Sequence, residues 1–580
     1  MRKIVVWLLI GIMMMSCLPA FAQAMTPGTY EGSVPGYHGD IKVKVTVDSE
    51  KITAIEIIEH SETAGIGEAA LPMLVEAVLN NQTVNVDTIS GATVTTTAFK
   101  DAVTAALTAA GADMGLFTAS VVKGELKEET LNADVVIVGS GVAGLTAASY
   151  AQQQGASTIL LEKTGLIGGA SAMAGGGTKV IGSKITQADS DFEADRAQFI
   201  SDMLANGHNN NHLPTVEIYA DTIGPAFDWV ISEDGAAVPY TTKFEGRGAG
   251  VAAALNRSYE KFGGKLLLNT PATELIVNDG VVTGVIAQGP DTLYTINAKA
   301  VILASGGYGA NDDLVPEEYL RYVYAGHAGA EGDAITMVEG LNADLINMQF
   351  INTQPNSMIL PSGLGQYCNP GVSKAYALGG FMVNQDGVRF VNEKTNAWDI
   401  MQEMKKNDFQ YLVMDQAAFD GFNEGMTGSA IYTMEDVAAW LQDDYTGQPK
   451  MYTAESLEAL AAKMGVPADA VLASAKAFNE VAAVGGDDEF GRNLTAAQST
   501  EGPFYALQMH IRYYASLGGL HVNDDCAVLN TAQEPIPGLY AAGEVIGGLQ
   551  GDVYMGGSLF GWAIASGHHA AVSAVESLAK

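Results

Sequence analysis

Cysteine is scarce in this chain of 580 residues, which has only Cys17, Cys368 and Cys526. The three are too far apart to form a Cys-x-x-Cys pair, so the sequence offers no ligand set for an iron–sulfur cluster and no attachment site for c-type haem. Cys368 and Cys526 could form at most one disulfide. Any redox chemistry of this chain must therefore use another cofactor.

Basic residues are also few, because 30 Lys and Arg residues stand against 66 Asp and Glu residues, giving a formal net charge of -36. A surface of this sign repels a phosphate backbone instead of releasing counterions from it. Nucleic acid is therefore not expected as a partner. Hydrophobic residues make up 48% of the chain, which supports a large buried core and excludes a disordered protein.

Long apolar runs are absent except near the start, where residues 4–15 form a run of 12 apolar residues after Arg2 and Lys3. This run is too short to span a bilayer. Together with the small residues Ala22 and Ala24 it predicts a signal peptide over residues 1–24, and hence an exported protein of the periplasm or cell envelope. Cys17 leaves a lipid-anchored form open as an alternative.

The segment after the leader predicts a small α+β domain at residues 25–112. Apolar and polar residues alternate over 41–47 and 52–58, which is typical of half-buried strands. Residues 69–79 and 98–110 have helical periodicity, and Gly111 suits a helix C-cap. Residues 113–130 are charged and show little periodicity, so we expect a linker there.

A βαβ unit follows the linker. The apolar run 134–138 predicts a buried strand, the glycine-rich stretch 139–144 (GSGVAG) comes directly after it, and residues 145–154 predict a helix. A second apolar strand at 158–161 ends at Glu162. In this context the glycines allow close approach to a pyrophosphate, and Glu162 can accept hydrogen bonds from ribose hydroxyls.

Both NAD and FAD use such a unit, but the downstream glycines favour FAD. Residues 168–171 and 175–177 are too glycine-rich for an ordinary surface loop, and two further apolar strands run into glycines at 301–309 and 538–544. They outline a discontinuous domain. The candidate residues for non-covalent FAD binding are Gly139, Gly141, Gly144, Glu162, Gly168, Gly169, Ala170, Ser171, Gly176, Gly306, Gly543 and Glu544.

From about residue 130 to its C-terminus the chain resembles the soluble fumarate reductase and urocanate reductase family. The resemblance rests on the dinucleotide fingerprint, on residues 387–393 (GVRFVNE) and on residues 538–548. It implies an α/β fold in which a Rossmann-like FAD domain, at 131–349 and 513–580, is interrupted by an α+β capping domain at 350–512. It also implies that Arg389 gives the proton when FAD N5 delivers hydride. Because a guanidinium is a poor acid, Arg389 would need burial and a relay of polar groups.

Residues 87–93 (DTISGAT), with 62–67 upstream, resemble the motif through which FMN-binding domains accept FMN as a phosphoester. Thr93 occupies the position of the modified threonine. The resemblance implies a covalent FMN at which electrons enter from an external donor, such as a quinol dehydrogenase, a cytochrome or a flavin carrier.

The sequence departs from this family at the substrate site. The family binds a dicarboxylate with a second arginine and with histidines, but this chain has Tyr554 in place of the arginine and Gln354 in place of one histidine. Residues 514–519 also lack the histidine that the family commonly has before the glycine pair. An unpaired buried carboxylate is costly, so fumarate is disfavoured as the substrate. Urocanate also has a carboxylate, which weakens the case for it as the substrate. Tyr554 with Ser558 resembles the arrangement in 3-ketosteroid dehydrogenases of the same superfamily.

The sequence therefore predicts an exported two-flavin enzyme that reduces an activated C=C bond of a small organic electron acceptor. The candidate catalytic residues are Arg389, Tyr554, Ser558 and Gln354, and no metal site is expected. Three alternatives remain open at this point: a 3-ketosteroid-type enone reductase or dehydrogenase, a non-catalytic electron-transfer flavoprotein, and a simple NAD-dependent dehydrogenase.

Overall fold

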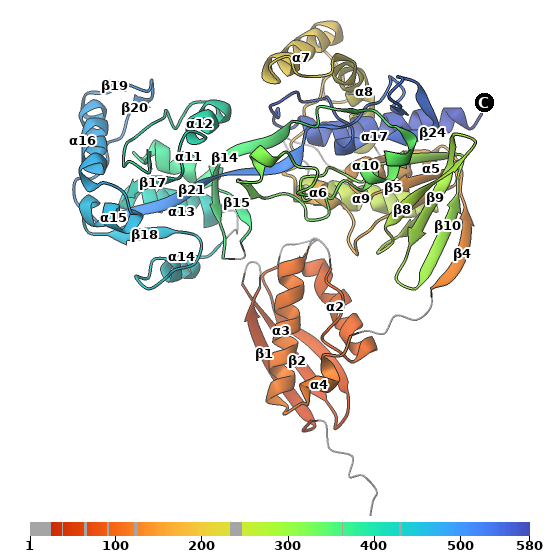
Figure 1. Cartoon of the computed structure of the whole chain (residues 1–580), viewed down its shortest axis with the longest axis horizontal. Coiled ribbons are helices and arrows are strands. Elements are labelled where there is room, and N and C mark those ends of the chain that lie inside the picture. Colours follow the sequence, from red (N-terminus) through yellow and green to blue (C-terminus); the bar gives the residue numbers. More distant parts are fainter. Residues whose placement is uncertain are drawn as a thin grey trace, which may run out of the picture. The chain divides into compact units, whose positions relative to one another are not determined.

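The computed structural model describes residues 25–36, 39–62, 67–89, 92–120, 126–232, 246–361, 363–427 and 432–579, and the Thr93 side chain is outside this description (Figure 1). The predicted signal peptide and part of the predicted FMN motif lie outside the described residues. The chain divides into two units, Met1–Lys123 and Gly124–Lys580. None of the described helices combines the length and apolarity that a membrane crossing requires.

The first unit has a three-stranded antiparallel sheet in the order β1-β2-β3, with strands β1 (Gly28–Pro35), β2 (Asp40–Val47) and β3 (Ile52–Glu59). The predictions for β2 and β3 are confirmed, and β1 is an additional strand. Alternate side chains of β2 point into the core, as the period of two requires. The helices of this unit are α2 (Gly67–Asn81), α3 (Thr93–Ala109) and α4 (Met114–Phe117).

The end of α3 agrees with the sequence. Gly111 has a φ of +71°, the left-handed conformation expected directly after a helix, and its N–H bonds to the Thr108 carbonyl. Within the predicted linker at 113–130 the structure has α4 near the start, and residues Lys127–Asn132 form strand β4 at its end. β4 pairs in parallel with β10, and both strands belong to the second unit. Short-range periodicity does not reveal such a pairing between distant segments.

The second unit contains a six-stranded sheet in the order β23-β24-β11-β5-β6-β7, in which every pairing except β23 with β24 is parallel. The predicted βαβ unit is confirmed as β5 (Val135–Val138), α5 (Val142–Gln153) and β6 (Thr158–Leu161). The remaining strands of this sheet are β7 (Lys265–Leu267), β11 (Ala300–Leu303), β23 (Ala527–Leu529) and β24 (Pro535–Ala541). The sheet therefore joins segments that lie hundreds of residues apart, as the predicted discontinuous fold requires.

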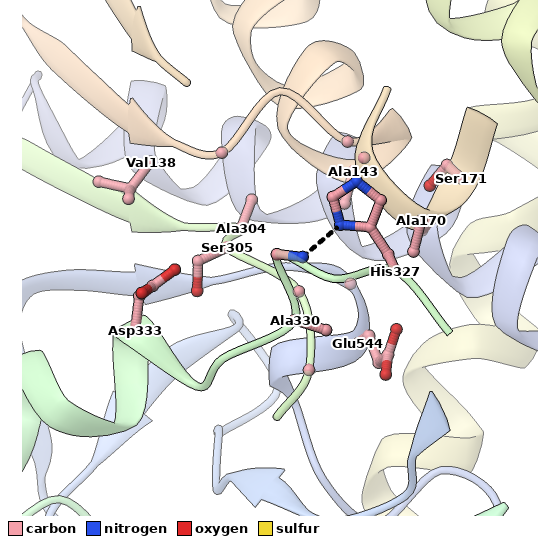
Figure 2. A pocket seen from close by; sticks show the side chains of 18 of the residues that line it. Val138, Ala143, Ala170, Ser171, Ala304, Ser305, His327, Ala330, Asp333 and Glu544 are labelled. Carbon is pink, nitrogen blue, oxygen red and sulfur yellow. Dashed lines mark hydrogen bonds between the residues drawn. The ribbon is translucent and has the colours of Figure 1, made fainter. Parts of the chain in front are cut away.

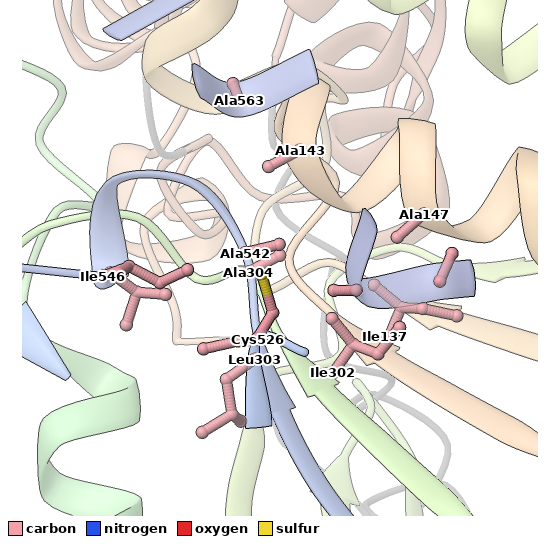
Figure 3. Packing of buried hydrophobic residues seen from close by; sticks show 14 of the residues in the cluster. Ile137, Ala143, Ala147, Ile302, Leu303, Ala304, Cys526, Ala542, Ile546 and Ala563 are labelled. Atoms are coloured by element: carbon pink, nitrogen blue, oxygen red, sulfur yellow. The ribbon is translucent and has the colours of Figure 1, made fainter. Parts of the chain in front are cut away.

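Helices and a smaller sheet surround this central sheet (Figure 1). The helices are α6 (Gly169–Met173), α7 (Phe192–Asn206), α8 (Leu213–Ile231), α9 (Arg247–Lys261), α10 (Asp333–Val338) and α17 (Ser558–Ser577). The smaller sheet has the order β4-β10-β9-β8 and contains β8 (Ala272–Asn278), β9 (Val281–Gln288) and β10 (Thr292–Asn297). Figure 3 shows Ile137 of β5, Ile302 and Leu303 of β11, and Cys526 among the apolar side chains of this core.

A second lobe, the cap, is built on a mixed sheet in the order β15-β14-β21-β17-β16. Its strands are β14 (Ile351–Ile359), β15 (Gly365–Tyr367), β16 (Phe381–Asn384), β17 (Gln410–Asp415) and β21 (Phe504–Ser516), with β12 (Val323–Tyr324) and β18 (Met451–Ala454) paired to β21. β14 and β21 are the long strands that lead from the cap toward the six-stranded sheet (Figure 1). Both strands therefore connect the cap to the rest of the second unit.

The cap helices cover both faces of this sheet and have their own apolar core. They are α11 (Asn369–Ala377), α12 (Ala397–Met404), α13 (Gln416–Thr427), α14 (Met434–Trp440), α15 (Leu457–Met464) and α16 (Ala468–Val484). Two-stranded pairs complete the second unit: β13 (Leu345–Ile346) with β22 (Gly519–Leu520), and β19 (Gly486–Asp487) with β20 (Asn493–Leu494). Cys368 and Cys526 are both buried and unpaired, so they form no disulfide.

Candidate active site

A large pocket lies where the loops after β5, β6, β11 and β24 come together (Figure 2). In open parallel sheets ligands bind at these carboxyl ends of the strands. Nine of the twelve predicted FAD-binding residues line the pocket: Gly139, Gly141, Glu162, Gly169, Ala170, Ser171, Gly306, Gly543 and Glu544. Gly144, Gly168 and Gly176 are not among the lining residues.

The glycine-rich loop after β5 has a tight geometry that only glycine permits. A Cβ on Gly139, whose φ is +103°, would lie 2.4 Å from the Ala304 carbonyl oxygen. A Cβ on Gly144 would lie 1.8 Å from the Gly139 carbonyl oxygen, so this glycine lets α5 pack against the loop. Gly141 is the N-cap of α5 and lines the pocket. The Val142 N–H at this helix end donates to the Ser171 hydroxyl at 3.3 Å, and the helix end as a whole suits a phosphate group.

Glu162 is buried at the end of β6, and four hydrogen bonds hold its carboxylate in place. One oxygen accepts from the Ser140 N–H and hydroxyl at 3.0 and 2.7 Å, and the other accepts from the Thr164 N–H and hydroxyl, both at 2.8 Å. Ser140 belongs to the glycine-rich loop. Glu162 thus ties that loop to β6 while still lining the pocket, which the sequence alone did not indicate.

Two further polar groups of the lining suit a cofactor. The Ser305 hydroxyl is buried and has no hydrogen-bond partner in the described structure, so it is available to a ligand group. Glu544 accepts from the Ser516 N–H and hydroxyl at 3.0 and 3.1 Å, and burial raises its pKa. Together with the glycine cradle, these groups fit FAD, the predicted cofactor.

Two tyrosines from different parts of the fold also line this pocket. Tyr514 comes from β21 and Tyr554 from the segment before α17, and their rings meet edge-on with centroids 6.4 Å apart. Burial raises the pKa of Tyr514 to about 12 and raises that of Tyr554, so both hydroxyls stay protonated near neutral pH. The Tyr554 hydroxyl accepts a hydrogen bond from the Gly557 N–H at 2.8 Å, and its proton remains free for a ligand.

A β-bulge places Tyr514. Along the antiparallel pair β14·β21, Asn352 lies opposite Ala515 and Thr353 lies opposite Tyr513, which leaves Tyr514 as the extra residue of β21. Bulges bend a strand locally and turn one side chain out of the regular alternation. Sequence periodicity gave no indication of this bulge.

Arg389 is placed differently from the prediction, because it is enclosed by cap residues and does not line the pocket. Its guanidinium donates to Glu393 through Nε at 2.9 Å and through Nη2 at 2.8 Å, and Nη1 donates to Asp488. The rings of Phe478 and Phe490 lie about 5 Å from the guanidinium carbon. These contacts are those of a buried ion cluster, in which Arg389 holds α16 and the β19–β20 segment against β16.

Glu393 is the centre of this cluster and gives a direct test of it. The carboxylate is buried and also accepts from Arg492 Nη1 at 2.7 Å and from the Met382 N–H at 2.9 Å. Glu393→Gln leaves two buried guanidinium groups short of a counter-charge, so we expect the free energy of unfolding of the cap to fall by about 3–5 kcal/mol. Urea unfolding measures this change.

The matched control is Glu403→Gln, which breaks the exposed pair of Glu403 with Lys406. An exposed pair contributes at most about 1 kcal/mol. If Glu393→Gln destabilised the cap no more than Glu403→Gln, the ion cluster would not have the structural role given to it here.

Ser558 and Gln354 are the other predicted catalytic residues, and neither lines the pocket. Ser558 is the first residue of α17, and its buried hydroxyl exchanges hydrogen bonds with the Gln550 amide. Gln354 lies in β14 opposite Arg512. Of the four predicted catalytic residues, Tyr554 is the one that the structure brings to the pocket.

Thr93, the predicted site of FMN attachment, is the first residue of α3, a helix of 17 residues. Its N-cap, Ala92, supplies no side-chain hydrogen bond to the helix, so N–H groups of the first turn remain available. Such a helix end favours a phosphate group. Ser90, Gly91 and the Thr93 side chain lie outside the described residues.

The chain matches two family models. The model described as FAD binding domain matches residues 134–250 and 244–560, and the model described as FMN-binding domain matches residues 36–108. The chain is 30% identical over 560 residues to the urocanate reductase of Eggerthella lenta, and the alignment covers 92% of this chain and 89% of that protein.

Two further proteins are similar to parts or all of the chain. The NADH:fumarate oxidoreductase of Klebsiella pneumoniae is 28% identical over 552 residues, which cover 92% of this chain and 56% of that protein. The open conformation of a flavocytochrome c3 fumarate reductase superposes with a TM-score of 0.63 at 24% identity, covering 77% of this chain and 78% of that one. At this identity the superposition establishes the fold alone.

Proposed function

The chain belongs to the fumarate- and urocanate-reductase-like flavoproteins, with an FAD binding domain and an N-terminal FMN-binding domain, and we propose that it reduces a C=C bond conjugated to a carbonyl or carboxyl group. As a member of this family it is an FAD-dependent oxidoreductase acting on CH–CH groups. The single observation that carries the finer proposal is the pair of protonated phenols, Tyr514 and Tyr554, in the lining of the FAD pocket.

Reduction of the double bond needs one hydride and one proton. Bound FAD supplies the hydride, and the proton must come from a group that touches the substrate. Arg389 is engaged by two carboxylates within the cap, which supports a structural role for it instead of proton donation. Tyr514 is the better donor, because its hydroxyl stays protonated and the Arg512 guanidinium, 4.4 Å from its ring, stabilises the phenolate left behind.

Tyr554 has a complementary task. Its hydroxyl already accepts one hydrogen bond from Gly557 and can donate its proton to a carbonyl oxygen of the substrate. Such a bond withdraws electrons from the conjugated double bond and stabilises the enolate that forms as hydride arrives. The two tyrosines thus have different roles: Tyr554 polarises the carbonyl of the substrate, and Tyr514 donates the proton.

The charges of the pocket argue against a dicarboxylate such as fumarate. Among the described residues of the lining, Lys163 is the one Lys or Arg, and it donates to both Glu331 and Asp333 at 2.7 Å. The described lining therefore offers no free cation to a substrate carboxylate, and burying two unpaired carboxylates is costlier than burying one. We therefore propose a small acceptor with at most one carboxylate as substrate.

Electrons are proposed to enter through FMN carried on Thr93, at the N-terminus of α3, from an external donor. The leader-like pattern of residues 1–24 supports export of the enzyme, and a covalent flavin would not be lost outside the cytoplasm. The proposed function is tested by reoxidation of the reduced enzyme with conjugated alkenes. We expect the saturated compound as product and no comparable reaction with fumarate.

A further inference from the structure

Arg512 is a cation without a counter-ion. It lies in β21, two residues before Tyr514, and it forms no salt bridge and no hydrogen bond with any residue of the described ranges. Its Nε atom is buried and lacks an acceptor. Arg512 is half-buried, and because charges that lose their water are normally paired, its guanidinium is suited to bind an anion.

The two buried arginines of the described cap, Arg389 and Arg492, differ from Arg512 because both have carboxylate partners. Arg389 donates to Glu393 and Asp488, and Arg492 donates to Glu393 and to two backbone carbonyls. Arg512, by contrast, lies against two aromatic rings, with its guanidinium carbon 4.6 Å from the centre of the Tyr367 ring and 4.4 Å from the centre of the Tyr514 ring. Stacking fixes the guanidinium plane and leaves its N–H edge free for a planar acceptor.

The position of Arg512 links this free cation to the pocket. Tyr514 contacts Arg512 on one side, lines the FAD pocket on the other, and meets Tyr554 edge-on. Burial without a carboxylate lowers the pKa of Arg512, and a bound anion would reverse that penalty. Gln354 of β14 lies opposite Arg512 in the sheet and adds a polar side chain beside it.

We propose that Arg512 binds the carboxylate of the substrate and makes the enzyme selective for unsaturated monocarboxylates. This inference rests on the proposed reductase function and names its substrate class. The double bond would then lie between Arg512 and the flavin side of the pocket, next to Tyr514 and Tyr554. Arg512 can pair with one substrate carboxylate. A second carboxylate would find no free Lys or Arg in the described pocket lining, so a monocarboxylate is favoured.

The test is a binding measurement on the purified protein with both flavins in the oxidised state. The probes are propanoate, 3-phenylpropanoate, imidazole-propanoate and 3-phenylpropanamide, and the readout is the change in the FAD absorbance spectrum. Loss of a charge-assisted pair should weaken binding of the preferred acid by about 100-fold or more in Arg512→Gln. Binding of the neutral amide should change less than about threefold, because it makes no such pair.

Two variants serve as controls. Arg321→Gln removes another arginine that stacks on a tyrosine, Tyr322, outside the pocket, and it should leave binding unchanged. Arg512→Lys keeps the charge and should restore part of the affinity for the acid. In turnover, the ratio of kcat/KM for cinnamate to that for methyl cinnamate should fall about 100-fold in Arg512→Gln, because effects on shared chemistry cancel in this ratio.

The outcomes separate the two proposals. Equal affinity of the wild type for acid and amide, no binding of any acid, or undiminished acid binding by Arg512→Gln would each overturn the anion site. Arg512-dependent binding of an acid, with no reduction of any corresponding alkene, would support the anion site and contradict the reductase proposal.

Discussion

Gly144→Val is expected to yield a protein that carries only one of its two flavins. The added Cβ would lie 1.8 Å from the Gly139 carbonyl oxygen, a distance that no side chain tolerates, so α5 and the glycine-rich loop must separate. Because the interior is close-packed, that shift disrupts the phosphate-binding end of α5, and we expect FAD content below about one-tenth of the wild-type value. Acid precipitation measures this, since released FAD stays in the supernatant.

The proposed covalent attachment of FMN to Thr93 supplies an internal standard for this experiment. The FMN should remain in the pellet of Gly144→Val, because the FMN-binding domain is untouched. Thr93→Ala should give the reciprocal pattern, with FAD in the supernatant and no flavin in the pellet. Gly340→Ala is the matched control, since a Cβ there has no neighbour within 4 Å. Full FAD content in Gly144→Val would contradict the assignment of this loop.

Tyr514→Phe is expected to lower kcat by about 10²–10⁴-fold, the usual contribution of a general acid. The ring remains, so its stacking on Arg512 and the shape of the pocket are retained. Binding of 3-phenylpropanoate should therefore be nearly unchanged, and FAD content should be normal. Stopped-flow measurement of flavin reoxidation separates this chemical step from binding.

Tyr367→Phe is the matched control for Tyr514→Phe. Tyr367 also stacks on Arg512 but does not line the pocket, so loss of its hydroxyl should leave the rate of reoxidation unaltered. A wild-type rate in Tyr514→Phe would show that the proton comes from elsewhere. An equal loss in both variants would point to the arginine stack instead of the Tyr514 hydroxyl.

Local patterns in the sequence predicted the cofactor-binding half of the molecule well. Strands β5 and β6, helix α5 and Glu162 follow from apolar runs and glycine spacing over about thirty residues, and the structure brings this loop and Glu162 to one pocket. Strand β1 was missed because the segment Gly28–Pro35 contains few apolar side chains. β4 was missed because it is almost wholly exposed and gains its partner, β10, from 165 residues away.

The substrate side was harder to predict because its contacts are not local. Arg389 lies in a diagnostic stretch, but its partner Asp488 is 99 residues further along the chain, and no pattern around Arg389 reveals that ion pair. Arg512 had one usable indication, since a charged residue inside the mostly buried strand β21 needs a partner. Only the structure shows that this partner is missing and that Tyr514 connects Arg512 to the pocket.

The central claim, that this chain delivers hydride and a proton to a conjugated double bond, is tested most directly by a single-turnover experiment. The fully flavinylated enzyme is reduced without oxygen and mixed separately with urocanate, cinnamate, an acrylate, a cyclic enone and fumarate. Our account predicts rapid flavin reoxidation by an unsaturated monocarboxylate, with one saturated product formed per two electrons, and little reaction with fumarate. Flavins that stay reduced with every alkene, while an external electron carrier reoxidises them, would contradict it.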